Sequence, residues 1–488
     1  MNNSNPAPRK VIPIAVVAGE PSQSSSVSDD GEAGSIYQAQ KKIYPRSVTG
    51  LFSKWRWAMV FITQIVFYGL PWLEWGQRQA VLFDLEARRF YILGLVLYPQ
   101  DFIYLSGILV ISALSLFLFT AVAGRQWCGY ACPQTVYTEI FLWLEKLTEG
   151  DRSARLRLDA SPMSVNKFTR KASKQFLWLA LSLWTGFTFV GYFTPIRELG
   201  VSFISAGMGP WETFWVFFYG FATYGNAGFM REQVCKYMCP YARFQSAMFD
   251  KDTLIVTYDE ARGEPRGSRS KKADPIALNL GSCIDCTLCV QVCPTGIDIR
   301  KGLQYECISC AACIDVCDTV MDKMNYPRGL IRYSTQNAVA QGWGKAQLLR
   351  RVFRPRVLVY SAILIAITIA LFASLALRSS FKVDVMRDRA SLARIVSGGK
   401  IENVYRLQVM NATERTQNYR ITASGLPGLV LASEGSFTVD ATGVRGVPVV
   451  LQLPYEAASA GSHEIYFEIE AIDSQERVTE KSVFLVPR

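Results

Sequence analysis

Long apolar stretches alternate with polar segments as far as residue 377. A helix needs about 20 mainly apolar residues to cross the hydrocarbon core of a bilayer. Five stretches reach or approach this length: Trp57–Leu73, Phe102–Ala123, Phe176–Thr194, Trp211–Met230 and Val357–Leu377. Phe90–Pro99 is too short to span and predicts an interfacial strand or a re-entrant piece. We therefore predict five transmembrane helices.

The pattern changes after the fifth stretch to short segments in which apolar and polar residues alternate. They are Val404–Val409, Tyr419–Ala423, Val447–Leu453, Glu464–Ile469 and Ser482–Val486, separated by Gly, Pro and Asn. Such spacing is typical of an antiparallel β-sandwich of the immunoglobulin type. The region holds no cysteine and no obvious catalytic cluster, so we interpret it as a docking or shielding module.

Basic residues are spread unevenly over the loops between the predicted helices. The loop from Arg125 to Lys174 holds nine, whereas Glu74–Asp101 and Pro195–Pro210 hold three and one. Basic loops tend to stay in the cytoplasm, so we expect the N-terminus and residues 125–175 and 231–356 there. With an odd number of spans, we expect the C-terminal sandwich on the periplasmic side of a bacterial inner membrane.

Composition excludes some classes of function. Half of the residues are hydrophobic and 19% are charged, which favours membrane insertion. The formal charge of +11 comes without a long basic run interleaved with aromatics, so we expect no nucleic-acid partner. His463 is the single histidine, which rules out two-histidine haem ligation and histidine-rich copper or zinc sites.

Eight of the twelve cysteines form two runs of C-x2-C-x2-C-x3-C. This is the spacing of bacterial two-cluster ferredoxins, in which the fourth cysteine of each run ligates the other cluster. The crossed pairing assigns Cys283, Cys286, Cys289 and Cys317 to one [4Fe–4S] cluster. It assigns Cys293, Cys307, Cys310 and Cys313 to the second. A module of this kind moves electrons one at a time, so the spacing predicts a redox function.

Two other interpretations of these cysteines are weaker. A four-cysteine zinc site uses two C-x2-C pairs per ion, whereas here a third and a fourth cysteine follow each pair. A disulfide framework conflicts with the reducing cytosol that this segment should face.

The remaining four cysteines form a second duplicated motif, C-x3-C-P. It comprises Cys128 and Cys132 with Pro133, after the second span, and Cys235 and Cys239 with Pro240, after the fourth. If each stretch is helical, positions i and i+4 share a face, and up to four thiolates could converge at the cytoplasmic edge of the bilayer. Thiolate ligands suit Cu(I). Another iron–sulfur centre, a thiol–disulfide couple and simple packing are the alternatives.

Together these features predict a membrane protein of mixed helical and β structure with five regions. Residues 1–45, rich in Ser, Pro, Gly and Asp, form a disordered cytoplasmic tail. Its apolar patch is too short for a secretory signal, so we expect an uncleaved chain. Residues 46–245 carry four transmembrane helices and both C-x3-C-P motifs, and residues 246–350 form the inserted ferredoxin-like module. Residues 351–378 are the fifth helix, and residues 379–488 the immunoglobulin-like sandwich.

The combination resembles the FixG/CcoG family of accessory proteins for cbb3-type cytochrome c oxidases, from about Tyr44 to the C-terminus. The marks are Arg-Gln-Ala-Val-Leu-Phe-Asp at 78–84, Pro-Gln-Asp at 99–101, both C-x3-C-P motifs, the double ferredoxin motif and the sandwich. Asp318 stands where the ferredoxin pattern has a second proline. Proline is no ligand, so we expect both clusters to assemble.

The resemblance implies a membrane-bound cupric reductase, an oxidoreductase that supplies Cu(I) for oxidase assembly. Cys128, Cys132, Cys235 and Cys239 would then be the copper-reduction site, fed by the ferredoxin cysteines. The implied partners are membrane lipid, a cytosolic electron donor, a copper transporter or chaperone and the oxidase assembly machinery. Self-association into a homo-oligomer is left open.

Two other functions fit the same residues. The chain could be a quinone-linked membrane ferredoxin that passes electrons between quinone and a partner enzyme. It could also be a non-enzymatic assembly scaffold that binds oxidase subunits through its sandwich, with the clusters as sensor or structural staple.

Overall fold

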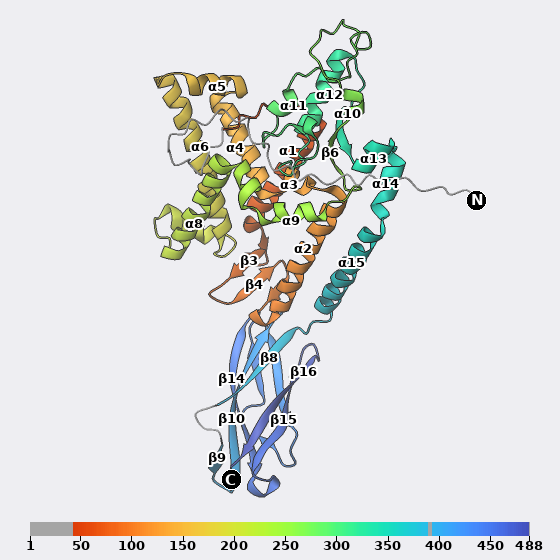
Figure 1. Cartoon of the computed structure of the whole chain (residues 1–488). Helices are drawn as coiled ribbons and strands as arrows, with labels where there is room; N and C mark the ends of the chain where they lie inside the picture. The colour runs from red at the N-terminus through yellow and green to blue at the C-terminus, as the bar shows by residue number, and fades with distance from the viewer. Residues whose placement is uncertain (1–41, 389–392, 488) are drawn as a thin grey trace, which may run out of the picture. The chain divides into compact units, whose positions relative to one another are not determined.

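The computed structural model of the chain describes residues 42–388 and 393–487. The predicted tail lies outside the described residues as far as residue 41. Each of the five apolar stretches is helical (Figure 1). The helices are α1 (Leu51–Gly69), α2 (Phe102–Ala123), α6 (Val165–Val190), α8 (Pro210–Thr223), which the π-helix η3 (Tyr224–Met230) continues, and α15 (Pro355–Ala376).

Two of these five helices are long and apolar enough to cross a membrane. They are the stretch Pro99–Ala123, which contains α2, and α15. The other three differ for identifiable reasons: α1 contains Lys54 and Arg56, the first part of α6 is basic, and α8 changes to π-helix after 14 residues. The structure therefore supports two of the five predicted spans.

Helices α2 and α15 lie side by side (Figure 1). A Cβ added to Gly107 on α2 would lie 2.8 Å from a Leu371 methyl on α15. The Tyr104 hydroxyl donates a hydrogen bond to the Ser374 carbonyl over 3.2 Å. The missing side chain at Gly107 thus allows the two helices to pack closely.

Shorter elements connect these helices. The helical ones are α3 (Gln126–Tyr130), α4 (Pro133–Glu149), α5 (Arg152–Ala160), α7 (Ile196–Ile204), the π-helix η4 (Val234–Met238), α9 (Pro240–Met248), and the 3-10 turns η1 (Leu70–Trp72) and η2 (Pro99–Asp101). The strands are β1 (Glu74–Trp75) paired with β2 (Arg78–Gln79), and a three-stranded antiparallel sheet of β3 (Val81–Asp84), β4 (Arg89–Ile92) and β5 (Leu95–Leu97). The short stretch Phe90–Pro99 therefore contains strands.

The Pro-Gln-Asp motif at the start of α2 has a structural role. Asp101 is buried, and its carboxylate pairs with Arg378 over 2.6 Å and with Lys382. Gln100 donates a hydrogen bond to Asp384 over 2.9 Å. The motif therefore ties α2 to the segment that leads from α15 into the sandwich.

The ferredoxin-like module is built on a two-stranded antiparallel sheet of β6 (Ile255–Tyr258) and β7 (Ile331–Ser334). Its helical elements are α10 (Glu260–Gly263), α11 (Leu288–Gln291), η5 (Ile299–Lys301) and α12 (Ala312–Met324), and it is followed by α13 (Gln336–Gln341), α14 (Lys345–Arg350) and η6 (Arg351–Phe353). Val256, Ile299, Met321 and Ile331 are buried in a core that several cysteines complete. The side chains that hold the module together therefore also surround the cysteines.

The C-terminal region is the predicted immunoglobulin-like sandwich, with two sheets ordered β12-β14-β10-β8 and β13-β11-β15-β16, and β9 paired to β10. The strands are β8 (Phe381–Arg387), β9 (Arg394–Val396), β10 (Lys400–Asn411), β11 (Gln417–Ser424), β12 (Val430–Leu431), β13 (Ser436–Val439), β14 (Val444–Pro454), β15 (Gly461–Ala471) and β16 (Arg477–Val486), with the turn η7 (Tyr455–Ala457). Alternate residues of the long strands, such as Ile465, Phe467 and Ile469, are fully buried. This alternation is why the sequence pattern was informative.

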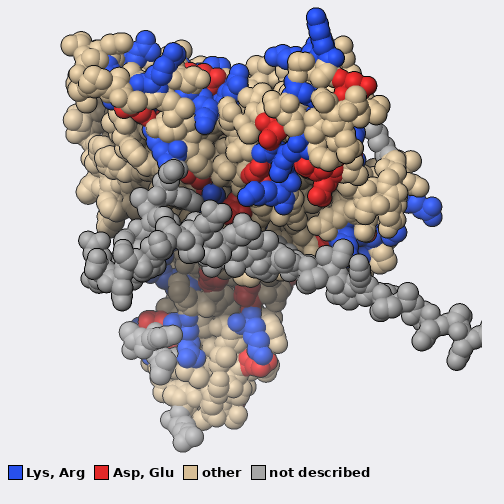
Figure 2. Space-filling model, turned by 45° about the horizontal axis from the view of Figure 1, so that its top comes forward, with Lys and Arg blue, Asp and Glu red and all other residues tan. Residues whose placement is uncertain are grey.

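Charged side chains are not evenly mixed on the surface. Figure 2 shows Lys and Arg gathered in patches on one face, with Asp and Glu between them. The patches contain both signs of charge and do not merge into one basic surface on this face.

Candidate metal centres

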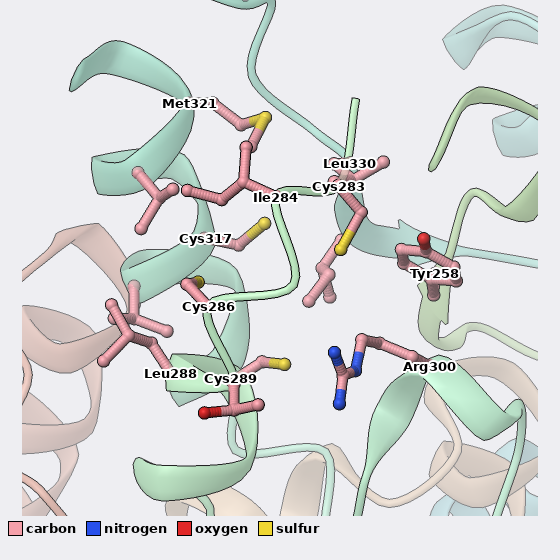
Figure 3. A pocket seen from close by; sticks show the side chains of 14 residues that line it. Tyr258, Cys283, Ile284, Cys286, Leu288, Cys289, Arg300, Cys317, Met321 and Leu330 are labelled. Carbon is pink, nitrogen blue, oxygen red and sulfur yellow. The ribbon is translucent and has the colours of Figure 1, made fainter. Parts of the chain in front are cut away.

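One cavity of the ferredoxin-like module is lined by Cys283, Cys286, Cys289 and Cys317. Figure 3 shows their sulfur atoms around the same space, between α12 and the loop that carries the first motif. The rest of the lining is mainly apolar, and Arg300 is its one charged residue. These are the four cysteines that the crossed pairing groups together.

A second cavity is lined by Cys293, Cys307, Cys310 and Cys313, and also by Cys289, which lines the first cavity as well. Cys313 and Cys317 stand four residues apart on α12, and each belongs to a different cavity. One helical turn thus carries the chain from one cavity to the next. Each cavity therefore takes cysteines from both motifs, and the two motifs are interleaved in space.

The two C-x2-C loops repeat an unusual backbone conformation. Asp285, Thr287, Ser309 and Ala311 have positive φ angles of 51°, 55°, 54° and 59°. They occupy equivalent places, two residues after the first cysteine and one after the second. Left-handed residues alternating with ordinary ones turn successive N–H groups inward and form a concave anion site of the kind found around iron–sulfur clusters. Both cavities therefore fit a cluster in ligand chemistry and in backbone shape.

Burial keeps the free thiols neutral. It raises the pKa of Cys289 to about 11 and those of Cys307 and Cys317 to about 12. Metal ligation requires thiolates, so cluster binding at these positions must displace protons.

Asp318 replaces proline for a structural reason. It lies inside α12, where proline would interrupt the helix, whereas Pro294 follows Cys293 beyond the end of α11. The Asp318 carboxylate accepts a hydrogen bond from the Gly329 N–H over 2.9 Å. It thereby ties α12 to the segment that leads into β7.

The C-x3-C-P motifs are not continuous helices, which corrects the expectation of an i, i+4 face. α3 ends at Tyr130, and Cys132 is the extended residue before α4, with φ −60° and ψ 128°. Cys239 stands in the same way before α9, with φ −76° and ψ 111°. The cause is the proline that follows, which disfavours helical geometry in the preceding residue and is favourable as the first residue of a new helix.

The break gives two of the thiols a special position. Cys132 and Cys239 each lie at the N-terminus of a helix, of 17 and 9 residues. The positive end of a helix dipole stabilises a thiolate. The backbone N–H groups of Gln134 and Thr135 act in the same direction on the pKa of Cys132, although burial dominates and the pKa is raised.

The four thiols are near one another. Burial, together with the smaller effect of the charges of the other thiols, raises the pKa of Cys128 to about 11 and that of Cys235 to about 12. Gln245 donates a hydrogen bond to the Cys128 sulfur over 3.4 Å. Gln134, next to the first motif, donates to the carbonyls of Asn226 and Arg231, ahead of the second motif, over 2.9 and 3.1 Å.

Proximity does not amount to a mononuclear site. Among the described residues, no three His, Cys, Asp or Glu side chains are close enough to hold a single metal ion. The expectation that four thiolates converge is therefore met only in part: the thiols share a region without gathering around one point.

The thiol region abuts the second ferredoxin motif. A small cavity has Cys235 on its wall together with Cys310, Ile308 and Pro294. A Cβ added to Gly129, in the first C-x3-C-P motif, would lie 2.7 Å from the Ile308 carbonyl oxygen and 2.9 Å from the Cys310 Cα. Glycine here allows the two motifs to touch through their backbones.

Arg125 supplies positive charge between the two groups of cysteines. The residue is 4% exposed, its guanidinium donates to the Ala242 carbonyl over 2.6 Å, and its Nε has no partner. No carboxylate within the described ranges forms an ion pair with it. Burial lowers its pKa, and the opposing negative charges are those of Cys128, Cys307, Cys235 and Cys239. A buried charge without a counter-charge costs several kcal/mol, so this arginine fits thiolate centres around it.

Comparisons with known proteins agree with this geometry. One family model, a 4Fe-4S dicluster domain, matches residues 230–336, and another, a 4Fe-4S binding domain, matches residues 105–149. A third, an IG-like fold at the C-terminal of FixG, matches residues 371–487. The nitrogen fixation protein FixG of Rhizobium meliloti is 38% identical over 438 residues, which are 83% of this chain and 84% of that protein. The chain belongs to the FixG family.

Other relatives extend the match. Protein RdxB of Cereibacter sphaeroides is 38% identical over 471 residues, 94% of this chain and 98% of that protein. The crystal structure of a FixG-related protein from Vibrio parahaemolyticus aligns with 22% of this chain and 97% of its own, at 23% identity and a TM-score of 0.21. With two iron–sulfur family matches, this FixG-family chain is an iron–sulfur electron-transfer protein.

Sequence reasoning missed a buried charge cluster that supports the second C-x3-C-P motif in this FixG-family chain. Glu145 on α4 is 1% exposed and pairs with Arg155 over 2.7 Å and with Arg231 over 3.2 Å. Lys174 on α6 pairs with Glu149 over 2.9 Å. Burial would raise the pKa of Glu145, but the charges of Arg231 and Arg155 outweigh it and the pKa is lowered. The sequence pattern relates the basic residues of this region to membrane topology alone, because no local pattern distinguishes an ion-paired cation from an unpaired one.

Removing the central acid should destabilise the protein. Glu145→Ala leaves Arg155 and Arg231 buried without their partner, and breaking such a pair costs about 3–5 kcal/mol. We expect a lower thermal unfolding midpoint for the detergent-solubilised protein, compared with Glu260→Ala, which changes an exposed residue of the ferredoxin module. Equal midpoints for the two variants would show that the cluster contributes little.

Proposed function

We propose that this FixG-family protein reduces Cu(II) to Cu(I) at its C-x3-C-P thiols, with electrons from two [4Fe–4S] clusters. Cys283, Cys286, Cys289 and Cys317 hold the first cluster, and Cys293, Cys307, Cys310 and Cys313 the second. The observation that carries the proposal is the cavity whose wall contains both Cys235 and Cys310. On this wall, a ligand of the proposed second cluster lies beside a thiol of the second C-x3-C-P motif.

The clusters, when bound, supply single electrons, and the reduction of one copper ion needs one. The chain's own residues do the rest. Arg125 favours the deprotonated thiols, because its buried charge has no carboxylate partner among the described residues. Cys132 and Cys239 gain from their helix N-termini, and Gln245 holds the Cys128 sulfur in place.

Sulfur ligands also favour the product. Thiolates are soft donors that prefer Cu(I), whereas Cu(II) prefers nitrogen and oxygen. The thiol region therefore holds the reduced ion more tightly than the oxidised one and increases the driving force for reduction. Release to a copper transporter or chaperone, and from there to the assembly machinery of cbb3-type oxidases, completes the proposed role.

Membrane insertion is part of the proposal. Besides α2 and α15, the helices α1, α6 and α8 with η3 would cross the inner membrane. Large apolar side chains on α1 and α8 support this, such as Ile65 and Trp211, which are 69% and 73% exposed. The N-terminus and the clusters would face the cytoplasm, where an electron donor binds, and the sandwich the periplasm.

X-ray absorption of copper added to the dithionite-reduced and desalted protein tests the assignment. We expect Cu(I) with sulfur in its first shell. Cu(II) with only oxygen or nitrogen neighbours would contradict the proposal.

A third iron–sulfur centre at the same thiols is the second candidate. The 4Fe-4S binding-domain match at 105–149 contains Cys128 and Cys132, and the dicluster match at 230–336 contains Cys235 and Cys239. Iron and acid-labile sulfide analysis separates the two. Two clusters require eight irons per chain and leave the four thiols free, whereas about twelve irons would favour the third centre.

The contact at Gly129 should control electron transfer to the thiols. Gly129→Ala places a Cβ against the backbone of Ile308, which must move. A longer path between the second motif and the thiols slows electron transfer, so we expect copper reduction to be slower than in the parent protein at unchanged iron content. Gly225→Ala, whose Cβ would meet nothing within 4 Å, is the control. Equal rates of copper reduction in both variants would show that the contact at Gly129 does not affect electron transfer.

A further inference from the structure

A separate cavity, of about 370 Å³, lies between the start of α1, helix α4 and the two ferredoxin motifs. Its charged lining residues are Arg46, Lys54, Arg56, Lys146, Arg155, Glu139 and Asp151. Arg155 is paired with Glu145, and Asp151 accepts hydrogen bonds from Ser47. Arg46, Lys54 and Lys146 form no ion pair within the described part of the chain. The cavity therefore carries an excess of positive charge.

Arg56 adds a buried donor to this cavity. It is 6% exposed, it lies 3.8 Å from Glu139, and its Nη1 donates to the Cys310 carbonyl over 3.3 Å. Its Nε has no partner. Its guanidinium therefore adds a further positive charge to the wall of the cavity, held in place by Glu139 and the Cys310 carbonyl.

The cavity also has an aromatic side. Trp57 and Trp143 meet edge to face there, with ring centres 6.3 Å apart, and Leu142 lies beside them. Indole rings of this kind bind flat ring systems by stacking. The lining thus combines one surface for a ring with another for an anion.

The back wall belongs to both ferredoxin motifs. Val292 and Pro294 flank Cys293, and Ala312 precedes Cys313. A molecule in the cavity would therefore lie next to two of the proposed ligands of the second cluster. This position suits a donor of electrons rather than a structural ligand.

We propose that the cavity is the electron-uptake site of the protein and binds a reduced flavin nucleotide. Its ring would pack on Trp57 and Trp143, and its phosphate on Arg46, Lys54 and Lys146. A reduced nicotinamide fits less well because it gives a hydride, whereas clusters accept single electrons. A quinol fits less well because it is neutral and would leave the cations unpaired. The proposal deepens the proposed function by naming the donor, and it rests on the ligand set of the second cluster but not on copper.

The reaction balances without a further reagent. The reduced flavin anion FMNH⁻ becomes oxidised FMN, two electrons and one proton. The electrons leave one at a time, one to each oxidised cluster, and the proton goes to water.

Binding is tested with oxidised FMN, through quenching of its fluorescence by the cavity tryptophans in the purified, cluster-loaded protein. We expect saturable binding, about tenfold weaker in the double variant Lys54→Gln/Lys146→Gln. The matched control is Lys271→Gln/Lys272→Gln, two exposed lysines that do not line the cavity. Riboflavin, which lacks the phosphate, should bind the parent protein as weakly as FMN binds the first variant.

Electron uptake is measured in the same preparations by mixing photoreduced FMN with oxidised protein and following cluster bleaching. The Lys54/Lys146 variant should be reduced more slowly than the control pair at low FMN concentration, and equally fast by dithionite. Equal FMN binding in the two double variants would overturn the proposal. So would binding of a short-chain anionic phospholipid where FMN does not bind, which would make the cavity a lipid site. Copper reduction by the dithionite-reduced protein, assayed in parallel, shows whether the proposed function itself stands.

Discussion

Serine at both Cys235 and Cys239 abolishes copper reduction, while iron and acid-labile sulfide stay at the level of the parent protein. This result is expected because neither residue lines the two cavities of the ferredoxin-like module. Cys235 lies on the wall of the cavity that Cys310 also lines, and Cys239 immediately precedes α9. The change therefore removes the electron acceptor site and leaves electron storage intact.

The variant also separates the two candidate roles of the thiols. Met238→Ser, which alters an exposed side chain of the same π-helix, is the control and should reduce copper normally. Unchanged reduction in the double serine variant would refute the assignment. Loss of about one third of the iron would instead identify the thiols as ligands of a third cluster.

Cys317→Ser removes the first cluster and leaves the second, although Cys317 belongs to the second motif in the sequence. The structure places it on the first cavity, with Cys283, Cys286 and Cys289. A redox titration followed by EPR should therefore show the same missing signal in Cys317→Ser and Cys283→Ser.

The reciprocal pair checks the crossed arrangement. Cys293→Ser and Cys307→Ser should lose the other signal, because both residues line the second cavity. If Cys317→Ser instead matched Cys307→Ser, each motif would hold its own cluster, and the crossed arrangement would be wrong.

The sequence allows the cysteine groups to be predicted because ligand spacing is a local property. The two C-x2-C-x2-C-x3-C runs restrict which sulfurs can reach one cluster. One cavity is lined by the four cysteines of the first predicted group, and the other by the four of the second group together with Cys289. The sandwich was also predictable, since alternation over much of β14 and β15 marks residues buried between two sheets.

Features that depend on tertiary contacts could not be predicted in the same way. The helix breaks at Cys132 and Cys239 follow from the next residue, proline, and could have been found from the sequence. The lack of a carboxylate partner for Arg125 could not, because charge pairing between distant segments leaves no local pattern. The number of spans lies between these cases: α1 and α6 combine apolar faces with basic residues, so hydropathy alone does not decide whether they cross the membrane.

The most direct test of electron transfer to copper is an EPR titration of the anaerobically purified protein. The clusters are reduced with dithionite, the reagent is removed, and Cu(II) is added in known portions. The account predicts that the reduced cluster signals disappear in proportion to the copper added, with one EPR-silent Cu(I) formed for each electron lost. Cluster signals that persist while Cu(II) binds to the protein would contradict it.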